Sequence, residues 1–169
     1  MSGARAAAWA LALALAAGPA AAQDLAYSFG AYDDCVSAGG TAEACVLAPA
    51  EACIEATEGG DTTAAMGGCY ERARLDWDDR LNRSYAAAIS AAERVEAEAR
   101  AGGWTQPPLI QPLREMQRAW IPFRDAACAF ELAQWGGGTG GGPATGACLA
   151  AETARQALRI EAFAERYAP

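Results

Sequence analysis

The residues that could do chemistry in this 169-residue chain are six cysteines, a set of acidic side chains and a few polar positions beside aromatic ones. The sequence has no histidine. This excludes Ser-His-Asp and Cys-His catalysis and any zinc site that needs a histidine. No two cysteines form a CxxC motif, which disfavours thiol–disulfide exchange and a thiolate metal site. The six cysteines therefore indicate disulfides in an exported protein.

The acidic residues Asp76, Asp78 and Asp79 cluster as the paired carboxylates of a glycoside hydrolase would. Two of them precede an arginine by four residues, the order that favours an ion pair along a helix. Nucleophile elbows and EF-hand spacings are absent, and the GGGTGGGP run at residues 136–143 lacks the GK[ST] of a phosphate-binding loop. We therefore predict no enzyme, cofactor or metal. We expect three helical ion pairs: Asp76–Arg80, Asp79–Arg83 and Glu96–Arg100.

The charge of the chain, formally -8, is unevenly distributed. Residues 23–61 hold eight acidic residues and no arginine, whereas residues 62–169 hold 13 acidic residues and 12 arginines. The acidic segment is either solvated surface or an electrostatic docking face for a basic partner. Such an acidic chain argues against binding to nucleic acid or to an anionic membrane. The candidate docking residues are Asp33, Asp34, Glu55 and Glu58.

Residues 1–22 have the organisation of a secretory signal peptide. Arg5 is followed by an apolar run at 6–17, then by Gly18-Pro19 and the small residues 20–22. Twelve apolar residues are too few to span a bilayer. We expect cleavage after Ala22, a periplasmic or secreted mature chain, and no membrane anchor once the leader is removed.

The chain shows helical periodicity and no strand-like alternation. It predicts an all-α fold in which three main helices form a bundle beside a short helical, disulfide-bonded N-terminal arm. Pro122 should kink or divide the middle helix, and 136–143 should be a flexible loop. The helices expected are 25–38, a second capped by Thr41, 50–57, about 63–101, 109 or 111–134, and about 145–167.

Three sequence islands carry a family resemblance. The first is Cys53…Cys69 followed by Asp78, Leu81, Asn82 and Tyr85. The second is Trp120-Ile-Pro-Phe-Arg124-Asp125-x-x-Cys128, and the third places Cys148 and Arg155 after the glycine-rich loop. Together these islands resemble the N-terminal domain of the LprI-like lysozyme inhibitors, a helical, disulfide-bearing family of exported bacterial proteins.

This resemblance implies an LprI-like helical domain at 53–160, flanked by an acidic arm at 23–52 and a helix end at 161–169. It implies the disulfides Cys53–Cys69 and Cys128–Cys148, which leaves Cys35 to pair with Cys45. The function implied is inhibition of a lysozyme-type glycoside hydrolase by protein–protein contact. The alternative is a non-inhibitory module that binds another envelope protein or peptidoglycan. The oligomeric state is left open.

The motif residues also have a physical interpretation of their own. Trp120 and Phe123 lie three residues apart, on one helix face. We expect both to bury against Trp77, Leu81 or Tyr85. The polar motif residues either form a charge-assisted network that ties three helices together or contact the target directly. In the first case Arg124 reaches acidic residues on the long helix. These polar residues are Asn82, Arg124, Asp125 and Arg155.

Overall fold

The computed structural model describes residues 24–168, so the expected signal peptide at 1–22 lies outside the described residues. Within this range the chain forms five helices and no strand, which confirms the all-α prediction. None of these helices has an apolar stretch long enough to span a bilayer. The helices are α1 (Gly30–Ser37), α2 (Ala48–Ala56), α3 (Thr63–Gly102), α4 (Ile110–Gln134) and α5 (Gly141–Arg166).

The long helix α3 forms where the apolar repeat predicted it. Its N-cap is Thr62, whose side chain accepts a hydrogen bond from the Ala65 amide at 3.2 Å. Its C-cap is Gly103, at φ 73°, a left-handed conformation that glycine adopts without a steric cost. A stripe of small and large apolar residues, from Ala65 to Ala99, is buried along one face of this helix.

We expected Pro122 either to kink the middle helix or to divide it in two. Helix α4 is not divided and continues through Pro122. Proline cannot donate to the carbonyl of Arg118, four residues earlier. Both residues are exposed, so that carbonyl can be satisfied by solvent. The expected loop at 136–143 is also shorter, because α5 already begins at Gly141. Pro143 lies in the first turn of α5, where its missing amide costs no intrahelical bond.

The arm is less helical than expected. Residues 25–29 are not helical, since Leu25 and Tyr27 pack on the small core around Cys53 and Cys69. Thr41 accepts a hydrogen bond from the Ala44 amide at 3.2 Å, as a cap would, but the chain continues in turns instead of a helix. Only α1 and α2 remain helical in this part of the chain.

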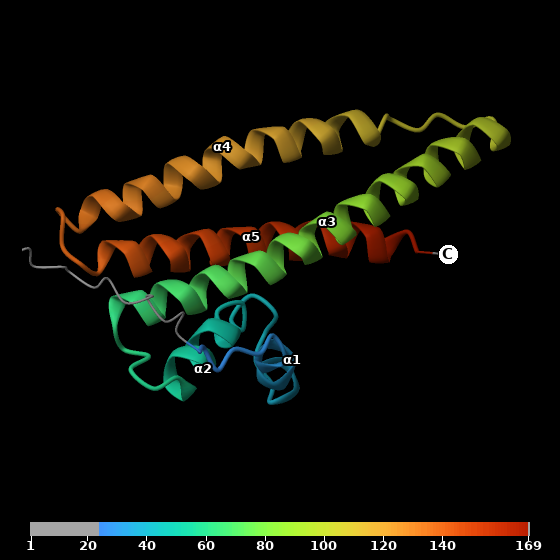
Figure 1. The fold of residues 1–169 in the computed structure, drawn as a ribbon. Coiled ribbons are helices and arrows are strands. Elements are labelled where there is room, and N and C mark those ends of the chain that lie inside the picture. The colour runs from blue at the N-terminus through green and yellow to red at the C-terminus, as the bar shows by residue number, and fades with distance from the viewer. Residues whose placement is uncertain (1–23, 169) are drawn as a thin grey trace, which may run out of the picture.

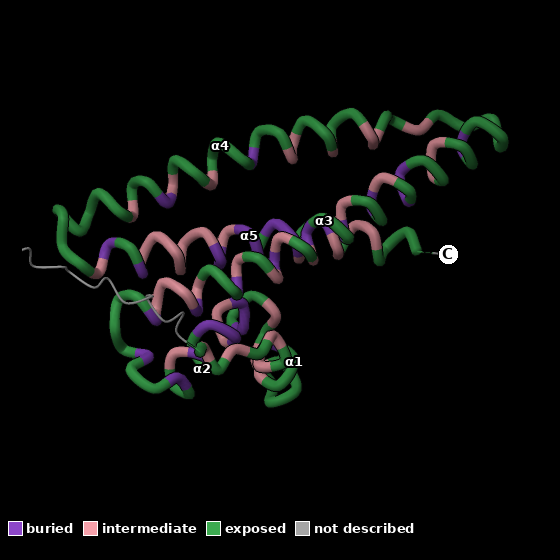
Figure 2. Tube along the Cα trace, in the orientation of Figure 1, coloured by how far each residue is buried: buried purple, intermediate pink, exposed green. Residues whose placement is uncertain are grey.

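The helices stack in layers (Figure 1). Helices α3 and α5 run together through the middle, α4 covers one side of the pair, and α1 and α2 lie on the opposite side. The α3–α5 contact is close because its buried residues are mostly alanine, such as Ala88, Ala92, Ala154 and Ala157. Helix α4 packs mainly on α5 and touches α3 little. Figure 2 shows the result, since α4 is exposed over most of its length.

Three disulfides fasten these layers. Cys35–Cys45 closes the arm, Cys53–Cys69 joins α2 to α3, and Cys128–Cys148 joins α4 to α5. Their Cα–Cα distances of 5.8, 5.8 and 5.5 Å lie in the normal range. The pairing is the one that the resemblance and the remaining two cysteines predicted.

Candidate functional site

The aromatic residue of the second island belongs to the core. Trp120 is 8% exposed and shares one apolar cluster with Trp77 and Leu81 of α3, with Tyr85 packed against it. This is the burial that we expected of Trp120. Leu81 is therefore a core residue, and Trp120 is the large side chain that α4 contributes to the core.

Phe123 does not follow Trp120 into the core, which corrects our expectation. Its side chain is 61% exposed. Because α4 packs on α5 and barely on α3, only a narrow stripe of α4 is covered, and a residue three positions from Trp120 falls at the edge of that stripe. Phe123 instead lines a groove.

The polar motif residues form local pairs, and the expected three-helix network is not present. The guanidinium of Arg124 bonds the adjacent carboxylate of Asp125 at 2.7 Å and stacks over the Trp120 ring at 4.9 Å. Asn82 donates to Asp78 at 3.3 Å within α3. Arg155 pairs with Glu152 within α5. These side chains lie at the surface of their own helices, so the nearest partner is a neighbour in sequence.

A groove of 320 Å³ between α4 and α5 brings residues of the second and third islands together. Trp120 and Phe123 line it from α4. Across the groove the Gln156 amide donates to the Gln117 carbonyl at 3.0 Å. Sequence reasoning missed Gln156, although a polar residue between Ala154 and Ala157 in an apolar stripe was a signal of a buried polar contact. The α5 residues lining the groove are Glu152, Arg155, Gln156 and Arg159.

The acidic segment 24–61, which extends past the arm expected at 23–52 and is called the acidic arm below, keeps its charge in solvent. All eight acidic residues of the segment 24–61 are exposed, and none forms an ion pair with another described residue. Asp33 and Asp34 lie on α1, Glu55 lies on α2, and Glu58 follows in the loop. Eight exposed carboxylates that have no ion-pair partner among the described residues produce a negative potential on this side of the molecule.

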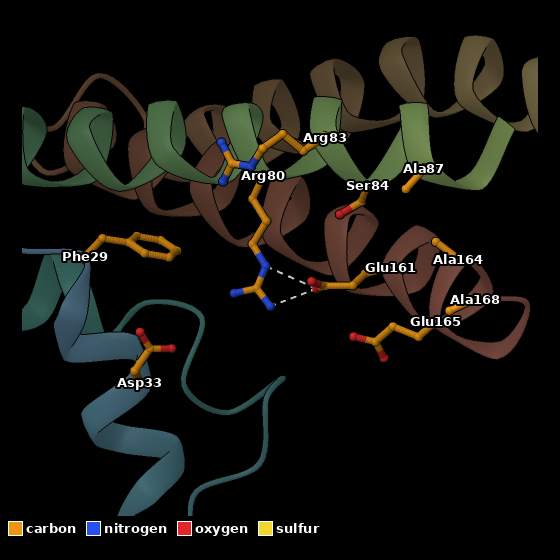
Figure 3. Close-up of a pocket in the computed structure, with 10 residues that line it drawn as sticks. All are labelled: Phe29, Asp33, Arg80, Arg83, Ser84, Ala87, Glu161, Ala164, Glu165 and Ala168. Atoms are coloured by element: carbon orange, nitrogen blue, oxygen red, sulfur yellow. Dashed lines mark hydrogen bonds and ion pairs between the residues drawn. The ribbon is translucent and has the colours of Figure 1, made fainter. Parts of the chain in front are cut away.

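A second hollow, of 510 Å³, lies between α1, α3 and α5 (Figure 3). In it Arg80 donates to Glu161 at 2.8 and 3.1 Å, an ion pair that joins α3 to α5. The same guanidinium lies 5.1 Å from the Tyr32 ring centre and 5.2 Å from that of Trp77. Asp33 reaches the rim of this hollow from α1. Arg80 of α3 thus contacts both α5, through Glu161, and the arm, through Tyr32.

None of the three ion pairs expected along α3 forms among the described residues, and for two of them the acidic residue makes a longer-range contact instead. Asp76 accepts a hydrogen bond from the Tyr27 hydroxyl at 2.8 Å, and burial together with this bond raises the pKa of Tyr27. Glu96 accepts from the amides of Leu109 and Ile110 at 2.7 and 3.2 Å. These two bonds lower the pKa of Glu96. Helical spacing alone did not reveal partners contributed by the arm and by the next helix.

The sequence matches the family model described as lysozyme inhibitor LprI over residues 53–159. The chain belongs to the LprI family of lysozyme inhibitors. The region that matches the LprI model begins in α2 and ends in α5, so it includes all of α3 and α4. It also includes the disulfides Cys53–Cys69 and Cys128–Cys148, which the family resemblance predicted. Comparison with curated proteins and with solved structures gave no match. LprI proteins are described as lysozyme inhibitors and not as enzymes. Membership of this family therefore makes the chain a lysozyme-inhibitor-like protein.

Proposed function

We propose that this protein is exported to the bacterial cell envelope, where it binds and inhibits a cationic lysozyme by protein–protein contact, without catalysis of its own. The observation that carries the proposal is the exposed acidic arm of a chain that belongs to the lysozyme inhibitor family LprI. The disulfides fit an oxidising compartment outside the cytoplasm.

The arm supports a specific role in this process. Its carboxylates, including Asp33, Asp34, Glu55 and Glu58, are exposed and free of ion pairs with described residues, so their field extends into solvent. A field of this kind attracts a basic enzyme and raises the association rate more than it deepens the final affinity. We therefore assign the arm to the encounter with the enzyme.

Inhibition requires that the bound protein block the substrate cleft, where two carboxylates perform glycoside hydrolysis. The loop 136–140 between α4 and α5 is the candidate for this contact. It carries two glycines with positive φ, Gly136 at 55° and Gly137 at 88°, and it is largely exposed. A narrow, exposed turn of this kind can enter a cleft.

The experiment is a titration of the oxidised protein against c-type, g-type and i-type lysozymes. Inhibition that is complete at one protein per enzyme, with a complex of the summed mass, supports the proposal. If no class binds at micromolar protein and the protein instead co-sediments with purified peptidoglycan sacculi, it is an envelope-binding module and not an inhibitor.

A further inference from the structure

A further hollow, of 360 Å³, adjoins the groove between α4 and α5, where the start of α4 lies beside the end of α5. Met116 and Arg159 line both the groove and this hollow, so the two are continuous. Arg159 contributes the one polar side chain among the described residues of its lining. We call this hollow the α4–α5 pocket, and its apolar lining consists of Leu109, Pro112, Leu113, Met116, Ile160 and Phe163.

The guanidinium of Arg159 is held in place by a chain of hydrogen bonds. Its Nη1 donates to the Gln156 side chain at 3.0 Å, and the Gln156 amide donates in turn to Gln117 of α4 at 3.0 Å. Gln156 is 1% exposed, so this chain is anchored inside the protein. Arg159 forms no ion pair with another described residue. Its Nε and Nη2, which can bond a carboxylate side by side, accordingly have no partner among the described residues.

The acids nearest to Arg159 do not take this position. Glu152, which lines the adjoining groove, is paired with Arg155. Glu43 of the arm lines a neighbouring hollow together with Arg159 but forms no ion pair with it. The guanidinium at the side of the pocket therefore presents an uncompensated positive charge beside an apolar lining.

We infer that the α4–α5 pocket binds a free fatty acid, with the acyl chain among the apolar residues and the carboxylate on Arg159. The lining selects both parts of this ligand. An alkyl chain has no polar group to leave unsatisfied, whereas a peptide segment would bring amide N–H groups for which the lining side chains offer no acceptor. Arg159 can only donate, so the polar end of the ligand must accept hydrogen bonds, and a negative charge strengthens them.

The volume of the pocket sets the length of the chain. Its 360 Å³ lies within the range of small-molecule sites, which is about 300–1,000 Å³. If each methylene occupies about 30 Å³, as a water molecule does in the liquid, the pocket holds about twelve carbons. Dodecanoate should therefore fill it, and a longer chain should leave its additional carbons in solvent.

The test is calorimetric titration of the oxidised protein with saturated fatty acids of about eight to sixteen carbons. Affinity should rise about fourfold with each added carbon up to about twelve, and then level off. Dodecanoate should bind about tenfold or more tightly than dodecanol, which has the same chain without the charge. Arg159→Gln should reduce the affinity for dodecanoate to that for dodecanol and leave dodecanol binding unchanged. The matched control is Arg166→Gln, which removes an exposed arginine of α5 outside the pocket and should change neither affinity.

The position of the ligand is tested by the methionine methyl resonances in NMR spectra. Met116 lines the pocket and Met66 of α3 does not, so dodecanoate should shift the signal of Met116 and leave that of Met66 unchanged. The absence of binding below about 1 mM, or binding without a shift of Met116, would overturn the inference. Equal affinities for dodecanoate and dodecanol, or an Arg159→Gln variant that binds dodecanoate normally, would contradict the role of Arg159. Lysozyme is absent from both measurements, so their outcome does not depend on the proposed inhibition.

Discussion

The indole of Trp77 on α3 donates a hydrogen bond at 2.9 Å to the main-chain carbonyl of Val46 in the arm, and both residues are buried. Phe29 and Tyr32 pack edge-on against the same indole, with ring centres 5.1 and 4.9 Å away. The arm is thus built into the core of the helical bundle. Its acidic surface is consequently held in a fixed position relative to α3.

Trp77→Phe should destabilise the protein strongly. The change removes the only N–H of the side chain, leaves the buried Val46 carbonyl without this donor and opens a cavity. Together these effects should lower the free energy of unfolding by about 2–4 kcal/mol. Thermal unfolding measures this, with Trp104→Phe, at a residue 55% exposed, as the matched control. Equal melting temperatures for the two variants would mean that the Trp77–Val46 bond does not hold the arm.

The ion pair between Arg80 and Glu161 should couple α3 to α5. Both side chains are largely buried, with 22% and 26% of their surface exposed. A double-mutant cycle with Arg80→Met and Glu161→Gln should give a coupling energy of about 1–2 kcal/mol, above the usual value for surface pairs. The same cycle on Arg155 and Glu152, a pair within α5 in which Arg155 is half exposed, should give about 0.2–0.5 kcal/mol. A smaller coupling for Arg80–Glu161 than for the control pair would contradict this role.

Arg124→Ala should have only a modest effect on stability. The partner carboxylate of Asp125 is 56% exposed, so the substitution leaves no buried charge unpaired. What is lost is the stacking of the guanidinium on Trp120, worth about 0.5–1 kcal/mol at such a site. Chemical denaturation provides the measurement, and Arg124→Lys should restore little because an ammonium does not stack as a plane. A loss of several kcal/mol would require a buried partner that the structure does not show.

The contribution of Glu96 should depend on pH. Its carboxylate accepts hydrogen bonds from the first amides of α4, so its pKa is lower in the folded protein than in the unfolded chain. The resulting stability is present above the unfolded pKa and disappears as pH falls through the folded pKa. Glu96→Gln should therefore lower the melting temperature at pH 7, and the difference should vanish at acidic pH. A difference that persists unchanged at low pH would show that the charge of Glu96 is not involved.

The sequence predicted the elements that depend on local pattern. The helix α3 follows from its apolar repeat, and the disulfide Cys128–Cys148 follows from the family resemblance. It could not predict which face of α4 meets a neighbour, because Trp120 and Phe123 carry the same apolar signal. Packing on α5 buries the first and exposes the second.

The polar contacts were predicted least well. Arg80 has a suitable acid four residues before it, yet it bonds Glu161, 81 positions away, because the arm places Tyr32 against the other side of its guanidinium. Asp76 and Glu96 were likewise assigned to arginines on their own helix but meet Tyr27 and the start of α4. A surface side chain has several possible partners within reach, and only the three-dimensional packing selects one.

The proposed function is tested most directly by the association rate constant with a cationic lysozyme, measured at low salt and at about 0.5 M salt, where the Debye length falls well below 10 Å. The arm variant replaces Asp33 and Asp34 by Asn and Glu55 and Glu58 by Gln. The control variant carries the same change in net charge at exposed sites outside the arm, by Glu→Gln at positions 93, 98, 115 and 165.

We expect that high salt and the arm variant each slow association about tenfold or more. The control variant should slow it far less, and the dissociation rate should change little in either variant. Equal association rates for the arm variant, the control variant and the unmodified protein would contradict the role of the arm, and the absence of any complex at micromolar protein would contradict the inhibitor itself.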